Sequence, residues 1–183
     1  MIPTAFSSDG NLVPGDYEMT LDELRTSILV VGTGSSPSWD TPWRARLVEN
    51  LAILVEQLWS VGITEIFVDG SFVEDKDHPN DIDGYFVCQL RDIASGELAR
   101  RLNLIDPNKV WTWDPAQRRP YPGSPKRQLP MWLVYQVELY PHFGQLCGIR
   151  DKWGNELEFP SAFRQSRRDG RPKGIVKIIR RTT

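Results

Sequence analysis

The chain has very little cysteine. Cys88 and Cys147 are the only two in 183 residues. Two cysteines are too few for a disulfide framework, and this pair lacks the spacing of zinc ligands. Both are therefore expected to be reduced structural thiols, and a zinc site is not expected.

Long apolar runs are also missing. No run reaches the roughly 18 residues that span a bilayer, and the opening MIPTAFSSDGNLVPG lacks the basic and apolar regions of a secretory leader. We therefore expect a cytoplasmic protein without a membrane partner. The composition, 40% apolar and 25% charged, is that of a folded globular protein. The length predicts one domain over residues 1–183.

Charge is unevenly distributed along the chain, although the formal net charge is only -2. Positions 1–90 contain 4 basic and 15 acidic residues, whereas positions 91–183 contain 18 basic and 9 acidic residues. One interpretation is an acidic site that gathers metal ions beside a basic surface that holds phosphates or nucleic acid. The other is that the two sets interleave in space or form solvated faces that bind nothing.

Helices are expected in two places near the N-terminus. Thr20 and Glu23 form a capping-box pattern that starts a short helix over residues 21–31. Apolar residues then recur at helical spacing from Thr41 to Gly62. Residues 1–19 contain scattered proline and glycine without periodicity, so they are expected to form an extended arm, on the surface or disordered.

The remaining pattern predicts an α/β (α+β) fold. Its mixed, mostly antiparallel sheet would have four or five strands, with helices packed on one face. A weak helical pattern covers residues 92–104, and residues 160–166 are expected to form a short helix or a turn. Six prolines in 105–130 exclude regular structure over much of that long loop. Strands are expected at residues 64–68, from Asp81 onward, at 131–140 and at 174–180, the first two as an antiparallel pair.

One segment, VDGSFVEDKDHPNDIDGYF, carries the strongest chemical signal. Asp81 and Asp83 flank Ile82, and residues two apart in a strand point to the same face. Two adjacent carboxylates repel each other unless a cation lies between them, and hard oxygen ligands suit Mg²⁺. Gly70 allows close approach of the backbone, and the Ser71 hydroxyl with neighbouring N–H groups can hold phosphate oxygens.

This segment resembles the signature of the nucleotidyltransferase superfamily with the polymerase beta-like fold, a Gly-Ser turn followed by Asp-x-Asp on the next strand. The chain is similar, further, to small uncharacterised bacterial and phage nucleotidyltransferase-like proteins. That likeness rests on the NLVPG arm, the DGSFVEDKDHPNDID block, the strand ending at Tyr140-Pro141, and DGRPKGIVKI near the C-terminus.

The resemblance implies two-metal catalysis with Mg²⁺ or Mn²⁺. Asp81 and Asp83 would bind both ions, and Glu138 would bind the ion that activates the acceptor hydroxyl, although aspartate is more usual there. The predicted strand places Val134, Gln136 and Glu138 on one face.

The implied reaction moves NMP from an NTP to a hydroxyl of RNA, including tRNA, or of protein. Gly70 and Ser71 would hold the terminal phosphates, with Lys173 or Arg171 against the triphosphate and Lys76 as a further candidate. The resemblance also suggests a toxin, restrained by an antitoxin partner, in a toxin-antitoxin or phage-conflict system. The alternative is a non-catalytic NTP- or metal-binding regulatory or antitoxin module with the same fold.

Each candidate also has a purely structural interpretation. The acidic pair can be a strand edge without a ligand, and Glu138, His78 and His142 can be ordinary structural or solvated residues. Trp111 and Trp113, near Arg118 and Arg119, either stack on bases or pack the long loop. The basic C-terminal residues either follow phosphates or form a solvated surface: Arg164, Arg167, Arg168, Arg171 and Lys173.

Overall fold

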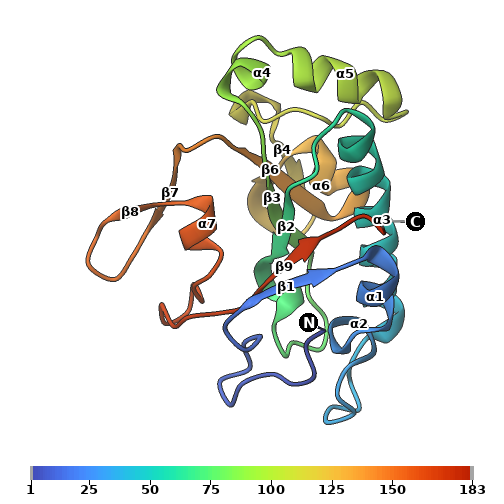
Figure 1. The fold of residues 1–183 in the computed structure, drawn as a ribbon, viewed down its shortest axis with the longest axis vertical. Coiled ribbons are helices and arrows are strands. Elements are labelled where there is room, and N and C mark those ends of the chain that lie inside the picture. The colour runs from blue at the N-terminus through green and yellow to red at the C-terminus, as the bar shows by residue number, and fades with distance from the viewer. Residues whose placement is uncertain (1, 182–183) are drawn as a thin grey trace.

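The computed structural model describes residues 2–181, apart from the side chains of residues 124 and 125. Its centre is a five-stranded sheet in the order β1-β9-β2-β3-β6 (Figure 1). The strands are β1 (Asp16–Met19), β2 (Ile66–Asp69), β3 (Ile82–Val87), β6 (Val137–His142) and β9 (Ile175–Ile178). Two separate antiparallel pairs join β4 (Arg119–Tyr121) to β5 (Ser124–Gln128) and β7 (Leu146–Arg150) to β8 (Glu156–Glu158).

The sheet is mixed, as the sequence predicts. β1 runs parallel to β9 and β3 parallel to β6, whereas β2 is antiparallel to both β9 and β3. Four of the six described strand pairings are antiparallel when the two small pairs are included. The prediction of an α+β fold with a mostly antiparallel sheet is confirmed at this level.

The longer helices cover one face of the sheet. The helices are α1 (Leu21–Thr26), α2 (Ile28–Val31), α3 (Thr41–Ser60), α4 (Leu90–Ala94), α5 (Glu97–Ile105), α6 (Pro130–Tyr135) and α7 (Phe159–Ala162), with 3-10 turns at Gly70–Val73 and Pro115–Gln117. Apolar residues of α3 pack against Val68, Phe86 and Val176 of the sheet. The short helix α7 lies on the opposite face (Figure 1), where Phe159 and Phe163 pack on Tyr85. None of the described helices is both long and apolar enough to cross a bilayer.

Alternation along β3 decides which side chains reach each face. Ile82 and Phe86 belong to the core beneath α3, whereas Tyr85 belongs to the smaller apolar cluster beneath α7. Asp83 shares the Tyr85 side because residues two apart in a strand share a face. Polar groups of β3 therefore collect on the side opposite α3.

The predicted N-terminal helix begins as expected but divides in two. Both bonds of the Thr20–Glu23 capping box are present. Ser27 then ends α1 and begins α2, because its hydroxyl accepts a hydrogen bond from the backbone N–H of Leu29. The long helix α3 is confirmed, and Asp40 is its N-cap.

The predicted strand over 131–140 is wrong in its first half. Residues 130–135 form α6, which ends at Gln136 in the left-handed conformation with φ +51°, and β6 begins only at Val137. A short apolar run fits a buried helix and a buried strand equally well, and Pro130 in the first turn favours the helix. The predicted common face of Val134, Gln136 and Glu138 therefore does not exist.

Two segments expected to lack regular structure contain strands. Within the predicted arm, the described residues 2–19 do not form a loose segment, because Leu12 and Met19 are fully buried and β1 pairs with β9. The loop 105–130 contains the β4–β5 hairpin despite its prolines. Proline is tolerated there because an isolated two-stranded pair has edges where no ladder hydrogen bond is required.

Candidate functional site

Carboxylates from three neighbouring strands meet on the sheet face opposite α3. Asp69 of β2 is the register partner of Asp83 of β3, and Asp83 is in turn the register partner of Glu138 of β6. Directly paired residues project to the same face of a sheet. Asp81, two residues before Asp83, adds a fourth carboxylate to this row, hereafter the carboxylate row.

Asp83 is the electrostatic centre of the carboxylate row. Burial raises the pKa of its carboxyl to about 7, and the nearby charges of Asp81, Glu138 and Asp69 add to the rise, while Arg167 opposes it. Burial likewise raises the pKa of Asp69 to about 7, against the influence of Lys173. Like charges held this closely favour a proton or a cation among them.

The Gly70-Ser71 turn lies directly against Asp83. Gly70 directly follows β2 and has a φ of +75°. A Cβ atom at this position would lie 2.7 Å from Asp83 Oδ2. Glycine is therefore required both for the backbone conformation and for the close approach. The predicted neighbourhood of Gly70, Ser71 and Asp83 is present.

A pocket of about 230 Å³ opens between this turn and the C-terminal segment. Asp69, Gly70, Ser71 and Asp83 line one side, and Arg167 lines it from the other chain segment. The Arg167 side chain forms no hydrogen bond or ion pair with any described residue, and its charge still lowers the pKa of Asp83. The pocket thus combines clustered carboxylates, the Gly-Ser turn and the guanidinium of Arg167, which is unpaired within the described chain.

Two members of the carboxylate row already have polar partners. The indole N–H of Trp132 donates to Asp81 Oδ2 at 2.7 Å. Glu138 accepts from the Tyr140 hydroxyl, and its Oε1 lies 3.6 Å from Arg118 Nη1. Burial, with the Glu138 charge, raises the pKa of Tyr140, so its hydroxyl remains a donor.

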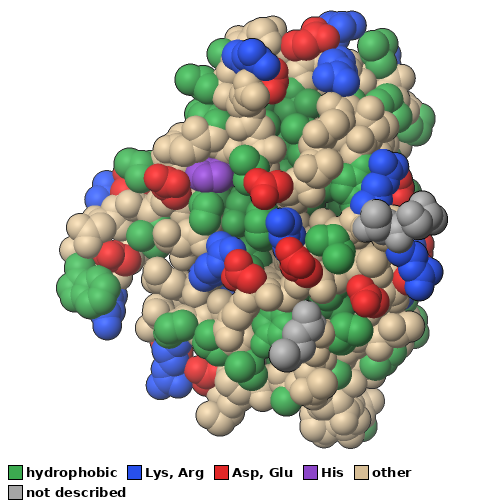
Figure 2. All heavy atoms as spheres, in the orientation of Figure 1, with side chains coloured by type: hydrophobic (Ala, Val, Ile, Leu, Met, Phe, Trp, Pro, Cys, Tyr) green, Lys and Arg blue, Asp and Glu red, His purple; other side chains and the backbone are tan. Residues whose placement is uncertain are grey.

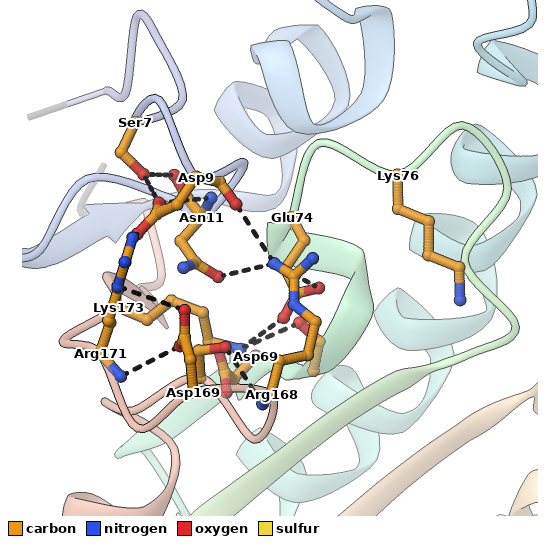
Figure 3. Close-up of polar contacts among 12 residues, drawn as sticks. Ser7, Asp9, Asn11, Asp69, Glu74, Lys76, Arg168, Asp169, Arg171 and Lys173 are labelled. Carbon is orange, nitrogen blue, oxygen red and sulfur yellow. Dashed lines mark hydrogen bonds and ion pairs between the residues drawn. The ribbon is translucent and has the colours of Figure 1, made fainter.

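Lys173 is buried beside the turn and lines the same pocket as Ser71 and Asp83. Figure 3 shows its ammonium reaching toward Asp69 and Glu74, at 3.1 Å and 3.3 Å. It also donates to the carbonyl oxygen of Gly70 at 3.3 Å. Three protein oxygens therefore bind the group that the sequence assigns to the triphosphate.

The structure does not bring the other two predicted cations to the pocket. Arg171 is exposed and pairs with Asp9 at 3.2 Å and Asp169 at 3.3 Å. Lys76 is exposed on the connector, and Figure 3 shows it directed away from Asp69 and Lys173. Neither residue lines the pocket beside Ser71.

The structural interpretation holds for the aromatic residues of the long loop. Trp111 is buried and donates to Gln57 Oε1 at 2.6 Å, and the Trp113 indole donates to the Leu139 carbonyl oxygen at 2.8 Å. Trp111 and Trp113 are therefore packing residues and are not free to stack on a base.

The candidate His78 is at the surface, 2.8 Å from Asp40 Oδ2 and stacked on Trp43.

The long-range charge pattern resolves into pairs within the molecule. Arg164 lies 2.6 Å from Asp16, and Arg168 lies 3.7 Å from Glu74. The basic second half of the chain thus faces acidic residues of the first half, as the interleaving interpretation predicts. Arg167 is the basic residue of this segment that remains without such a partner in the described chain.

Metal binding can be judged from the donor set. Mg²⁺ takes one or two protein carboxylates and completes its shell with water and phosphate oxygens. Asp81 and Asp83 supply oxygen donors of that kind, and Asp83 lines the pocket whereas Asp81 does not. No group of three or more His, Cys, Asp or Glu side chains within residues 2–181 is arranged to hold a metal ion. The role of Glu138 as a third ligand stays a prediction.

Several residues of the site are not predicted from the sequence. The sequence does contain a signal for Asp69, because it lies two residues after Phe67 in β2. Both residues therefore share the sheet face of Asp83. Glu74, Trp132 and Arg118 carry no local signal, since their contacts to the site depend on how distant segments pack. Tyr140, by contrast, lies two residues from Glu138 in the same strand, so strand periodicity could have placed it there.

Comparison with known proteins leaves the activity open. No curated protein and no solved structure matches this chain. One family model does match, over residues 4–179, and its description is "Family of unknown function (DUF6932)". The match covers nearly the whole chain, and the protein therefore belongs to the family DUF6932.

Proposed function

We propose that this protein is a Mg²⁺-dependent nucleotidyltransferase that moves NMP from an NTP to an acceptor hydroxyl and releases pyrophosphate. The observation that carries the proposal is the shared pocket of Ser71, Asp83 and Arg167, in which the Gly70 turn touches the Asp83 carboxylate. A nucleoside triphosphate with its metal needs carboxylates for the cation and donors for the phosphates, side by side. This pocket offers both.

Each residue would have a separate task. Asp81 and Asp83 hold the ion, and the Ser71 hydroxyl with the backbone N–H groups of its turn binds the terminal phosphate oxygens. The uncommitted Arg167 offsets phosphate charge from the opposite wall. Bound Mg²⁺ supplies charge neutralisation at the phosphates and makes an acceptor hydroxyl more acidic. Glu138 extends the carboxylate row toward β6, where we place the acceptor.

A second candidate is a non-catalytic module that binds NTP or metal. It is favoured by the contacts of Trp132 with Asp81 and of Arg118 and Tyr140 with Glu138, which occupy two carboxylates of the row. In that case the pocket senses a nucleotide without turnover. A toxin role, or one restrained by an antitoxin partner, rests on the resemblance alone.

The deciding experiment uses each of the four α-labelled NTPs with total RNA and with protein lysate, in Mg²⁺ or Mn²⁺. The test variant is Asp81→Asn/Asp83→Asn. The matched control is Asp75→Asn/Asp77→Asn, which has the same spacing and charge change on the connector outside the pocket.

Label that reaches RNA or protein with the wild type and the control, but not with the test variant, supports the transferase. Label that persists in the test variant overturns it. Without label, NTP binding that depends on metal and is lost in the test variant favours the regulatory module. Absence of both label and binding overturns both candidates.

A further inference from the structure

A groove leads from the carboxylate pocket to the tip of the β7–β8 hairpin. Two cavities of about 570 Å³ and 460 Å³ lie between this hairpin and the segment 164–172. The first shares Arg167 and Gln165 with the carboxylate pocket, and the second shares Lys152 and Gln165 with the first. Figure 1 shows the hairpin standing away from the sheet, next to α7. We call this continuous depression the hairpin groove.

The hairpin groove is lined by more basic than acidic residues. Its described cations are Arg150, Lys152, Arg164, Arg167 and Arg168. The acids along it are Asp151 and Asp169. Asp151 is engaged within the hairpin turn, where it accepts from the backbone N–H groups of Trp153 at 2.9 Å and Asn155 at 2.8 Å.

Two of these cations have no carboxylate partner within the described chain. Arg167 stands at the pocket end, and Lys152 stands at the hairpin end. Asp169, by contrast, is paired with Arg171 at 3.3 Å. Spare positive charge at both ends of the groove attracts a ligand with repeated negative charge.

An exposed aromatic ring lies at the hairpin end of the groove. Trp153 is 75% exposed at the hairpin turn, and the Lys152 ammonium lies 4.3 Å from its ring centroid. Figure 2 shows apolar and basic side chains together at the tip of this projection. A tryptophan this exposed beside a cation is a stacking platform for a nucleobase whose phosphate lies close by.

We propose that the hairpin groove binds a single-stranded nucleic acid, with a base on Trp153 and phosphates along Lys152 and Arg167. Single strands are required because a base in a duplex is already stacked on its neighbours and is not available to the indole. The inference rests on the proposed function in one respect. It makes the acceptor of the transfer a nucleic-acid hydroxyl, delivered along the groove to the carboxylate row.

The test is fluorescence anisotropy with the full chain, without NTP or metal. The probes are labelled single-stranded RNA and DNA of one sequence, about ten nucleotides long, and the corresponding RNA duplex. The variants are Trp153→Ala, Trp153→Phe and Lys152→Gln/Arg167→Gln. The control Arg91→Gln/Arg101→Gln removes the same charge from exposed positions outside the groove.

We expect Trp153→Ala to weaken single-strand binding about fivefold or more, with most of the affinity retained in Trp153→Phe. The double glutamine variant should bind less tightly, and its logarithmic salt slope should decrease by about 0.7 per cation removed. The control should match the wild type. Preference for RNA, preference for DNA, or equal binding of both single strands over duplex all support the groove.

No single-strand binding, or equal losses in the variants and in the control, overturns the proposal. Label transferred to protein without binding of either oligonucleotide overturns the groove but leaves the transferase standing. Conversely, single-strand binding retained in Asp81→Asn/Asp83→Asn, with no transfer from any NTP by the wild type, overturns the transferase but supports the groove.

Discussion

Arg44 is fully buried in α3, yet no carboxylate among the described residues forms an ion pair with it. Burial lowers the pKa of its guanidinium to about 10, and the guanidinium carbon lies 3.8 Å from the Trp39 ring centroid. Its two terminal nitrogens donate to backbone carbonyl oxygens of Leu29, Phe72, Glu74 and Lys76, at 2.6, 2.7, 3.1 and 2.5 Å, whereas its buried Nε has no hydrogen-bond partner among the described residues. Arg44 therefore fastens the connector between the Gly-Ser turn and the acidic pair.

We expect Arg44→Met to lower the free energy of unfolding by at least ~3 kcal/mol, because several buried carbonyl groups lose their donor. Arg46→Met on the exposed side of the same helix should change it by less than ~1 kcal/mol. Urea denaturation of both variants measures the difference. Equal, small losses would show that the connector does not depend on Arg44.

His142 gives a pH dependence that can be measured. It is buried among aromatic rings, and burial lowers its pKa, against a smaller opposing influence of Glu158. The unfolded chain, with an imidazole pKa of about 6.5, then binds a proton more readily than the folded one. By linkage, this residue reduces stability as pH falls below about 6.5 and has no effect above it.

The variant His142→Phe keeps a ring in the site but does not titrate. Its free energy of unfolding should therefore rise relative to the wild type as pH falls from about 6.5 toward 5. Thermal denaturation over this pH range tests the expectation, and His78→Phe at the exposed histidine is the control. Parallel pH profiles for wild type and His142→Phe would contradict it.

At the scale of elements, the α6–β6 junction places Glu138 on the site face. Gln136 ends α6 with φ +51°, and its backbone N–H donates to the Trp132 carbonyl oxygen at 2.8 Å. This single left-handed residue ends the helix. Val137 then starts β6 in register with Ile82. Without it the helix would continue and Glu138 would not reach Asp83.

Left-handed conformation costs an L residue roughly 1–2 kcal/mol, which glycine avoids. Gln136→Gly should therefore leave the free energy of unfolding unchanged or raise it by up to ~1 kcal/mol, after the entropy cost of glycine. Gln136→Val should lower it, because a β-branched residue is a genuine outlier at positive φ. Guanidinium denaturation compares the two, and a valine variant as stable as the glycine variant would argue against a left-handed junction.

At the scale of the whole molecule, ion pairs connect the two halves of the chain around the apolar core. Lys173 precedes β9, which lies between β1 and β2 in the sheet, and its buried ammonium pairs with the buried Asp69 carboxylate. Lys177 makes looser pairs with Glu18 and Glu65, at 3.7 Å and 3.6 Å. The buried Lys173–Asp69 pair and the more exposed pairs of Lys177 thus link the chain around β9 to its two neighbours in the sheet.

Lys173→Met should lower the free energy of unfolding by about 3–5 kcal/mol, because it leaves a buried carboxylate uncompensated. Adding Asp69→Asn should recover most of that loss. The control Lys177→Met removes a partly exposed lysine and should cost less than ~1 kcal/mol. Urea denaturation measures all three, and a double variant no better than Lys173→Met would refute the pairing argument.

Prediction from sequence worked best where the signal was local. The capping box at Thr20, the long helix α3 and the antiparallel β2–β3 pair were all predicted and are present. The common face of Asp81 and Asp83 follows from strand periodicity alone. The helix at 130–135 was missed, because five consecutive apolar or aromatic residues have no period that separates helix from strand.

Sequence by itself therefore determined the α+β class, the Gly-Ser turn and the acidic pair, since these depend on residues close together in the chain. Tertiary structure decided that Asp69 and Glu138 join Asp83, that Lys173 is bound by protein oxygens, and that Arg167 remains uncommitted. The physical reason is that strand register and ion pairing between distant segments depend on how the whole core packs, which no local pattern encodes.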